Sequence, residues 1–314
     1  MWNTLSVAAT ALLLAGCAFD DDERFVPRPR AVYFLCSDDE GNRTVVKLNE
    51  TWQKTSEPAT DFDVYKTEKS AVVWTVFGNR IRGRESATGK TEEFTFDAFT
   101  PTGLCVGKDW HVVWGDKKLC FFQSRAKNRK TVVVATDFTP RIALYNNRKF
   151  YFAADSVVAV YHETAFAPLL KHKISFRAEH ADFDEMFNFV VIGRGMDGRY
   201  YSTKIGAASD VALDAGVPSA VRIVWHSRIW KSQFGSEAVL KTAGISVAGG
   251  VFPDIGRNVE NLFFDFRFSR GYYRSSDSLW IYDFSPDLSS QKMVFADRWT
   301  QKIIKARFEE TPTR

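Results

Sequence analysis

The chain has 314 residues, of which 45% are hydrophobic and 15% aromatic, enough to build the core of one large β domain. Its 42 basic and 38 acidic side chains give a formal charge of +4. These charges are spread along the sequence and form no basic stripe, which argues against a nucleic-acid partner.

An apolar run from Leu5 to Ala15 lies at the N-terminus. It is too short to cross a hydrocarbon core, which takes about 20 residues, and it fits the apolar segment of a secretory signal. The motif Leu14-Ala15-Gly16-Cys17 resembles the lipobox of bacterial lipoproteins, where signal peptidase cuts before a lipidated cysteine. No Lys or Arg precedes the run, so a signal cleaved without lipidation and a buried N-terminal helix are the alternatives.

The lipobox resemblance implies that residues 1–16 are a lipoprotein signal peptide, that Cys17 carries the lipid, and that residues 17–30 form a tether. Several acyl chains on one cysteine would supply the two signals that stable membrane anchoring requires. Ala18 favours the outer membrane, and either its periplasmic face or the cell surface fits. The acidic run Asp20–Glu23 resembles the surface-export signal of some bacterial lipoproteins, and a short solvated tether explains it equally well.

The body of the chain alternates short apolar runs with turn residues, a pattern typical of many short strands. Turn residues recur about every 40 positions, a period that indicates a β-propeller. The seven turns are Asp39-Glu40-Gly41, Gly78-Asn79, Gly115-Asp116, Asp155-Ser156, Asp197-Gly198, Gly235-Ser236 and Asp277-Ser278. The sequence therefore predicts an all-β, seven-bladed β-propeller over residues 31–308, followed by a polar tail at 309–314.

Two segments carry a resemblance to known propeller repeats. Residues 140–161, from Pro140 to Tyr161, resemble the YVTN type of repeat, and Arg84–Lys90 resembles the turn of a quinoprotein-type repeat. The resemblance implies the fold. It implies almost nothing about activity, because propellers host unrelated functions.

Aligning the strands with that repeat predicts how the ring closes. Inner strands are expected to begin near Phe62, Thr102, Arg141, Phe183, Ala220, Asn261 and Trp299. The last of these has no strands after it, and the first runs, Ala31–Leu35 and Thr44–Leu48, have no inner strand before them. The N-terminal strands and the C-terminal strand should therefore complete one blade, which removes exposed sheet edges.

Cysteine and histidine positions indicate no metal site and no cofactor. Cys36, Cys105 and Cys120 lie in apolar runs and read as small buried hydrophobes, although an exported compartment permits one disulfide among them. The five histidines show no metal-ligand spacing, and no nucleophile elbow or phosphate-binding glycine loop is present.

A ligand site, if there is one, is expected in the central channel, which the inner strands line. The candidate channel residues are Arg141, Asp184, Glu185, Arg222 and Lys302, with Asp63 behind them. Arginines and carboxylates together can bind an anionic or sugar-like ligand. The alternative, which we favour here, is that these charges pair with one another and with water.

Two functions fit the sequence. The first is a non-enzymatic scaffold, held at the outer membrane through Cys17, that binds an envelope protein and is compatible with a small-molecule or glycan ligand. It is similar in kind to the propeller lipoprotein of the outer-membrane barrel assembly machinery, although that family has eight regular quinoprotein repeats. The second is a channel-site hydrolase, lactonase-like or glycan-cleaving, for which no catalytic residue can be assigned.

Overall fold

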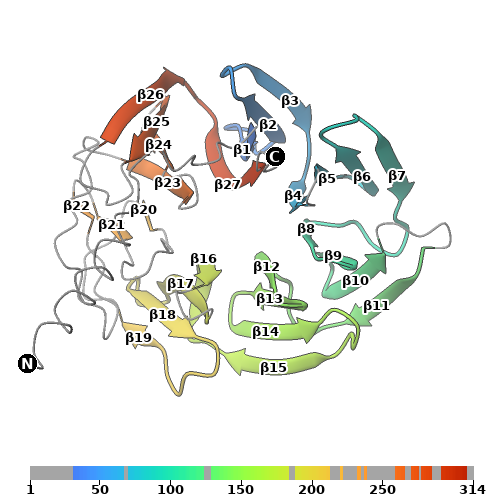
Figure 1. Cartoon of the computed structure of the whole chain (residues 1–314). Helices are drawn as coiled ribbons and strands as arrows, with labels where there is room; N and C mark the ends of the chain where they lie inside the picture. The colour runs from blue at the N-terminus through green and yellow to red at the C-terminus, as the bar shows by residue number, and fades with distance from the viewer. Residues whose placement is uncertain are drawn as a thin grey trace, which may run out of the picture.

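Strands separated by short turns make up the described part of the computed structural model. The structure describes residues 31–66, 70–123, 129–183, 188–212, 220–221, 232–234, 237–238, 259–265, 270–275, 277–284 and 291–309. Every element in these ranges is a β-strand, and none is a helix long and apolar enough to cross a membrane. The sheets lie side by side around a central axis, which is the arrangement of a β-propeller (Figure 1).

Six sheets have four strands each; in five of them the chain moves from the inner strand to the outer one, and in the sixth the inner strand is the last in the chain. The blade that contains both ends consists of β27 (Lys302–Glu309), β1 (Ala31–Ser37), β2 (Arg43–Asn49) and β3 (Lys54–Pro58). The next blade consists of β4 (Asp61–Lys66), β5 (Ala71–Phe77), β6 (Arg80–Glu85) and β7 (Thr91–Thr95). The third consists of β8 (Gly103–Val106), β9 (Trp110–Gly115), β10 (Lys118–Gln123) and β11 (Thr131–Ala135).

The remaining four-stranded blades follow in chain order. The fourth consists of β12 (Ile142–Asn146), β13 (Lys149–Ala153), β14 (Val157–His162) and β15 (Pro168–Lys173). The fifth consists of β16 (Phe176–Phe183), β17 (Phe189–Gly195), β18 (Tyr200–Lys204) and β19 (Val211–Ala212). The last before the closing strand consists of β23 (Val259–Asp265), β24 (Arg270–Ser275), β25 (Ser278–Phe284) and β26 (Gln291–Arg298).

In the described residues six complete blades are present, so the predicted count of seven is corrected to six complete blades there. Between β19 and β23 the structure describes only three short antiparallel strands, β20 (Ala220–Val221), β21 (Ser232–Phe234) and β22 (Glu237–Ala238). Strands of two or three residues form too few ladder hydrogen bonds to count as a full blade. The prediction came from turn spacing alone, and spacing does not reveal how much strand lies between the turns.

The recurring turns occupy the same position in each of the six blades. In each of the six blades the predicted turn connects the second strand to the third, as at residues 38–42 between β1 and β2. The turn geometry agrees with the residues used, because Gly41, Gly78 and Gly198 have φ values of 84°, 57° and 79°. The roughly 40-residue period is therefore the length of one blade plus its connection.

Ring closure occurs as predicted. β27 pairs antiparallel with β1, from Ala31 opposite Glu309 to Ser37 opposite Lys302. The side chains of these two strands add a second link, because the Tyr33 hydroxyl donates a hydrogen bond of 2.8 Å to the Glu309 carboxylate. The chain's described ends thus lie together in one sheet (Figure 1).

The start of the fifth inner strand differs from the prediction. β16 runs from Phe176 to Phe183, so Phe183 ends this strand instead of beginning it. The strand carries Arg177, Glu179 and His180 and has a register shift between Ala178 and His180. A polar and irregular strand of this kind has no apolar run to mark it in the sequence.

The core lies between neighbouring blades. One cluster joins Trp114 and Phe121 of the third blade to Phe150 and Phe152 of the fourth. Close packing explains a glycine at the start of β8, because a Cβ at Gly103 would lie 2.0 Å from the Trp114 ring. Aromatic residues at blade boundaries therefore serve inter-blade packing.

Candidate functional site

The five predicted channel residues do not form one described cluster. Asp184, Glu185 and Arg222 lie outside the described residues, as does Cys17. Lys302 is exposed at the start of β27, and Arg141 precedes β12 in a different blade. The only part of the predicted site that can be followed is therefore the surroundings of Arg141 and Lys302.

Arg141 links two neighbouring blades. Its Nε donates a hydrogen bond of 3.1 Å to the Ala178 carbonyl on β16, and its guanidinium lies 3.3 Å from the Asp155 carboxylate. Arg177 approaches the same carboxylate at 3.6 Å. The Asp155 side chain is 68% exposed, so both ion pairs are solvated, and the one with Arg177 joins two blades.

A buried ion cluster on the inner strands was missed by the sequence analysis, apart from Asp63. Asp61 and Asp63 of β4 pair with Lys305 and Arg307 of β27, at 3.1 Å and 2.5 Å respectively. Lys305 also donates to the Phe62 carbonyl at 2.5 Å. Both pairs are spaced two residues apart on their strands, so both lie on one face of each strand. We call these four residues the inner ion cluster.

The same two carboxylates also hold the next blade. Asp61 accepts a hydrogen bond of 2.8 Å from the Leu104 main-chain N–H, and Asp63 accepts one of 3.0 Å from Val106. These N–H groups belong to β8, the inner edge of its sheet, where no further strand could pair with them. Three blades are therefore joined by carboxylates that satisfy two cations and two edge N–H groups.

The pKa of Asp63 shows which influence dominates inside the cluster. Burial alone would raise the pKa of this carboxyl, but attraction to Arg307 and Lys305 and the hydrogen bond from Val106 bring it below its usual value. Burial likewise opposes the charge of Arg307, yet Asp63 raises the pKa of the guanidinium above its usual value. Both groups are therefore charged at neutral pH.

A pattern in the sequence could have revealed this cluster. Asp61-Phe62-Asp63 and Lys305-Ala306-Arg307 each place two like charges on one face of a strand. Adjacent like charges of this kind need opposite charges nearby when they are buried. The predicted ring closure already placed the C-terminal strand in the blade next to the one that begins near Phe62, but the two sets of charges were not matched with each other.

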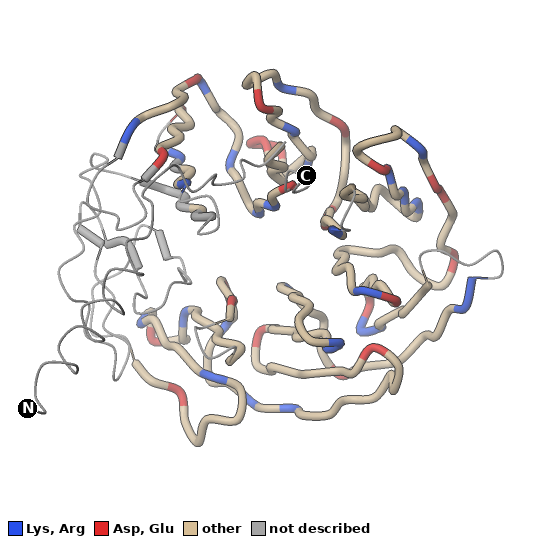
Figure 2. The backbone as a smooth tube through the Cα atoms, viewed as in Figure 1, with Lys and Arg blue, Asp and Glu red and all other residues tan. Residues whose placement is uncertain are grey.

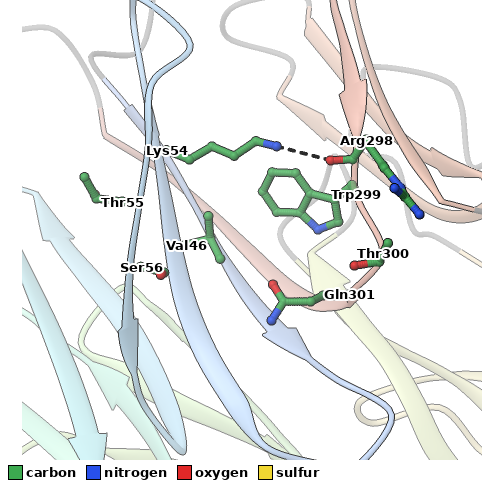
Figure 3. A pocket seen from close by; sticks show the side chains of 8 residues that line it. All are labelled: Val46, Lys54, Thr55, Ser56, Arg298, Trp299, Thr300 and Gln301. Atoms are coloured by element: carbon green, nitrogen blue, oxygen red, sulfur yellow. Dashed lines mark hydrogen bonds between the residues drawn. The ribbon is translucent and has the colours of Figure 1, made fainter.

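Two surface grooves lie beside β3, one toward each neighbouring blade. The first groove, of about 220 Å³, lies between β3 and the connection from β26 to β27 (Figure 3). Its lining consists of Val46, Lys54, Thr55, Ser56, Arg298, Trp299, Thr300 and Gln301. The Lys54 ammonium reaches across it, donating to the Arg298 carbonyl at 3.2 Å and lying 4.8 Å from the centre of the Trp299 ring.

The second groove, of about 250 Å³, lies on the side of β5 and β6. Its lining consists of Glu57, Pro58, Thr75, Phe77, Arg80, Arg82 and Glu93. Phe77 is 58% exposed, which is unusual for a phenylalanine, and Arg82 lies between Glu93 at 2.8 Å and Glu57 at 3.7 Å. An exposed aromatic ring therefore lies beside two arginines and two carboxylates in this groove.

The described part of the chain contains three free cysteines and no candidate metal site. Cys36, Cys105 and Cys120 are buried free thiols, so no pair of them forms a disulfide. Burial raises the pKa of Cys36 and of Cys120 to about 12. Within the described ranges no group of three His, Cys, Asp or Glu side chains is placed to hold a metal ion.

The ring of blades places the chain among β-propellers. No family model and no curated protein matches its sequence. Among solved structures, it is similar to a chain in the crystal structure of the mitotic checkpoint complex, with 10% identity, a TM-score of 0.44, and coverage of 90% of this chain and 86% of that one. It is also similar to the β-propeller domain of Cps50 (Swd1) from Myceliophteria thermophila, with 10% identity, a TM-score of 0.46, and coverage of 86% and 84%.

Proposed function

We propose that this protein is a non-enzymatic propeller scaffold that binds a protein partner and is held at the outer membrane by lipid on Cys17. The observation that carries the scaffold role is the inner ion cluster, whose charges satisfy one another and the edge of β8. General acid–base catalysis by two carboxylates would need pKa values that lie far apart and near the working pH. In the cluster, Asp63 instead has a lowered pKa.

The outer surface supports a binding role. Acidic and basic residues are interspersed along the described strands (Figure 2). Two grooves are lined in part by β3 residues. Exposed apolar side chains include Phe77 at the end of β5 and Leu169 on the outermost strand β15. The anchor is supported by the lipobox-like Leu14-Ala15-Gly16-Cys17.

The test of this function compares the full-length chain with Cys17→Ser in the native membrane. Metabolic labelling with radioactive palmitate and membrane fractionation report the anchor, and crosslinking followed by affinity purification reports the partner. We expect the wild-type chain to be labelled, to sediment with outer membranes and to yield one stoichiometric envelope partner. The Cys17→Ser chain should lose the label and the sedimentation. An unlabelled wild-type chain overturns the anchor, and the absence of any crosslinked protein overturns the scaffold role.

A further inference from the structure

The outer edge of β3 presents free main-chain groups. The Asn49 N–H donates to the Gln53 carbonyl, and the Ala59 N–H donates to the Arg43 carbonyl, at either end of the β2–β3 pair. Hydrogen bonding alternates along an antiparallel pair, so Thr55 and Glu57 also point their main-chain groups toward β2. Lys54 and Ser56 therefore point theirs outward. Because β3 is the last strand of its sheet, no described strand pairs with them.

The two grooves flank this edge on opposite faces of the blade, and we call the edge and both grooves the track. Residues 54–56 line the first groove, and Glu57 and Pro58 line the second, so both grooves lie along one strand. Five residues of strand span about 17 Å. Pro58 has no N–H, which sets the point where pairing along β3 must stop. The second groove also offers apolar surface, because Phe77 is 58% exposed.

A solvent-exposed arginine with a long ion pair lies at each end of the track. Arg298 is 78% exposed and lies 3.7 Å from Asp277, and Arg80 is 66% exposed and lies 4.0 Å from Glu93. These are long, solvated ion pairs that an incoming carboxylate can replace with a bidentate contact. Lys302, next to the first groove, is exposed and has no ion-pair partner among the described residues. The exposed cations at both ends can therefore receive carboxylates, while Glu57 and Glu93, which also line the second groove, are already held by Arg82.

We propose that β3 and its two grooves receive an extended segment of a partner protein, which adds a fifth strand to this blade. The segment carries a carboxylate near each end, facing Arg298 and Arg80, and an apolar side chain against Phe77. Main-chain hydrogen bonds to Lys54 and Ser56 supply affinity, and the grooves supply specificity. This inference rests on the proposed scaffold function and names its binding surface.

The test uses a fluorescent blocked peptide, acetyl-Asp-Thr-Val-Thr-Val-Leu-Asp-amide, titrated with the full chain by anisotropy at low salt. Ser56→Pro removes one outward N–H and no hydrogen bond within the sheet. We expect it to weaken peptide binding about tenfold or more, since the peptide carbonyl loses its partner. The matched control is Val133→Pro on β11, another exposed edge position whose N–H points outward, and it should leave binding unchanged.

The charge requirement is tested with the same peptide carrying Lys in place of both Asp residues. We expect no binding of that peptide and a loss of binding of the acidic peptide as salt rises. Equal binding of the two peptides, no binding of either, or equal loss in Ser56→Pro and Val133→Pro overturns the proposal. So does a dimer of the wild-type chain in analytical ultracentrifugation that Ser56→Pro converts to a monomer, because the occupant is then a second copy.

Crosslinking in the native membrane separates this inference from the scaffold function. If Ser56→Pro folds with an unchanged melting temperature and loses the envelope partner, both stand. If Ser56→Pro folds normally and keeps the partner, the scaffold function stands and the β3 surface is wrong.

Discussion

The exchange of a single buried charge tests the inner ion cluster. Asp63→Asn leaves the Arg307 guanidinium facing a neutral amide, and removing one partner of a buried pair typically costs about 3–5 kcal/mol of unfolding free energy. Urea denaturation measures this change. The control is Asp297→Asn, whose exposed ion pair with Lys54 should contribute at most about 1 kcal/mol. Equal, small effects of both variants would show that the cluster carries no stabilising charge interaction.

The lowered pKa of Asp63 also predicts an acid dependence. The unfolded chain binds a proton at this carboxyl more readily than the folded chain does. The free energy of unfolding therefore decreases when the pH is low enough to protonate the carboxyl in the unfolded chain. The contribution is complete above the unfolded value, near pH 3.9, and is lost as the pH falls through the folded value. Urea midpoints measured from pH 5 to pH 2.5 should therefore fall more steeply for the wild type than for Asp63→Asn. Parallel curves would contradict this assignment.

At the scale of the element, β27 is the strand whose removal should do most damage. Deleting residues 302–309 removes the partner of β1, two cations of the inner ion cluster and the Tyr33–Glu309 hydrogen bond. The exposed edge of β1 should then promote aggregation. Light scattering and thermal unfolding measure the effect, and a synthetic peptide of residues 299–314 added in trans should restore solubility. A deleted chain that stays monomeric and cooperative would show that the ring does not need this strand.

Some strands and their pairing could be predicted from the sequence, and others could not. The turn residues and the unpaired first and last apolar runs were enough to predict ring closure, because each strand must find a neighbour. The start of β16 was misplaced, since the polar residues Arg177, Glu179 and His180 leave no apolar run to mark this strand, which pairs with β17. The inner ion cluster and the grooves depend on which blades touch, and a pattern within one strand carries no information about its neighbour in the ring.

At the scale of the whole molecule, the three buried thiols report how cooperatively the ring opens. Cys36 on β1, Cys105 on β8 and Cys120 on β10 are buried, and burial raises the pKa of each thiol. They can react with a thiol reagent at pH 8 only when the structure opens. In the Cys17→Ser chain, peptide mass spectrometry should show one common labelling rate that rises with urea. A much faster rate at one cysteine would mean that its blade opens alone.

The place of β27 has a consequence for how the protein is made. A chain emerges from the ribosome with its N-terminal residues first, so β1, β2 and β3 are complete while the strand that pairs with β1 is the last to appear. Until residues 302–309 have been made, the inner edge of β1 has no partner strand, in addition to outer edges such as that of β3, which stay free in the closed ring. A chaperone that shields the inner edge of β1 would therefore be expected to act until residues 302–309 have been made or exported.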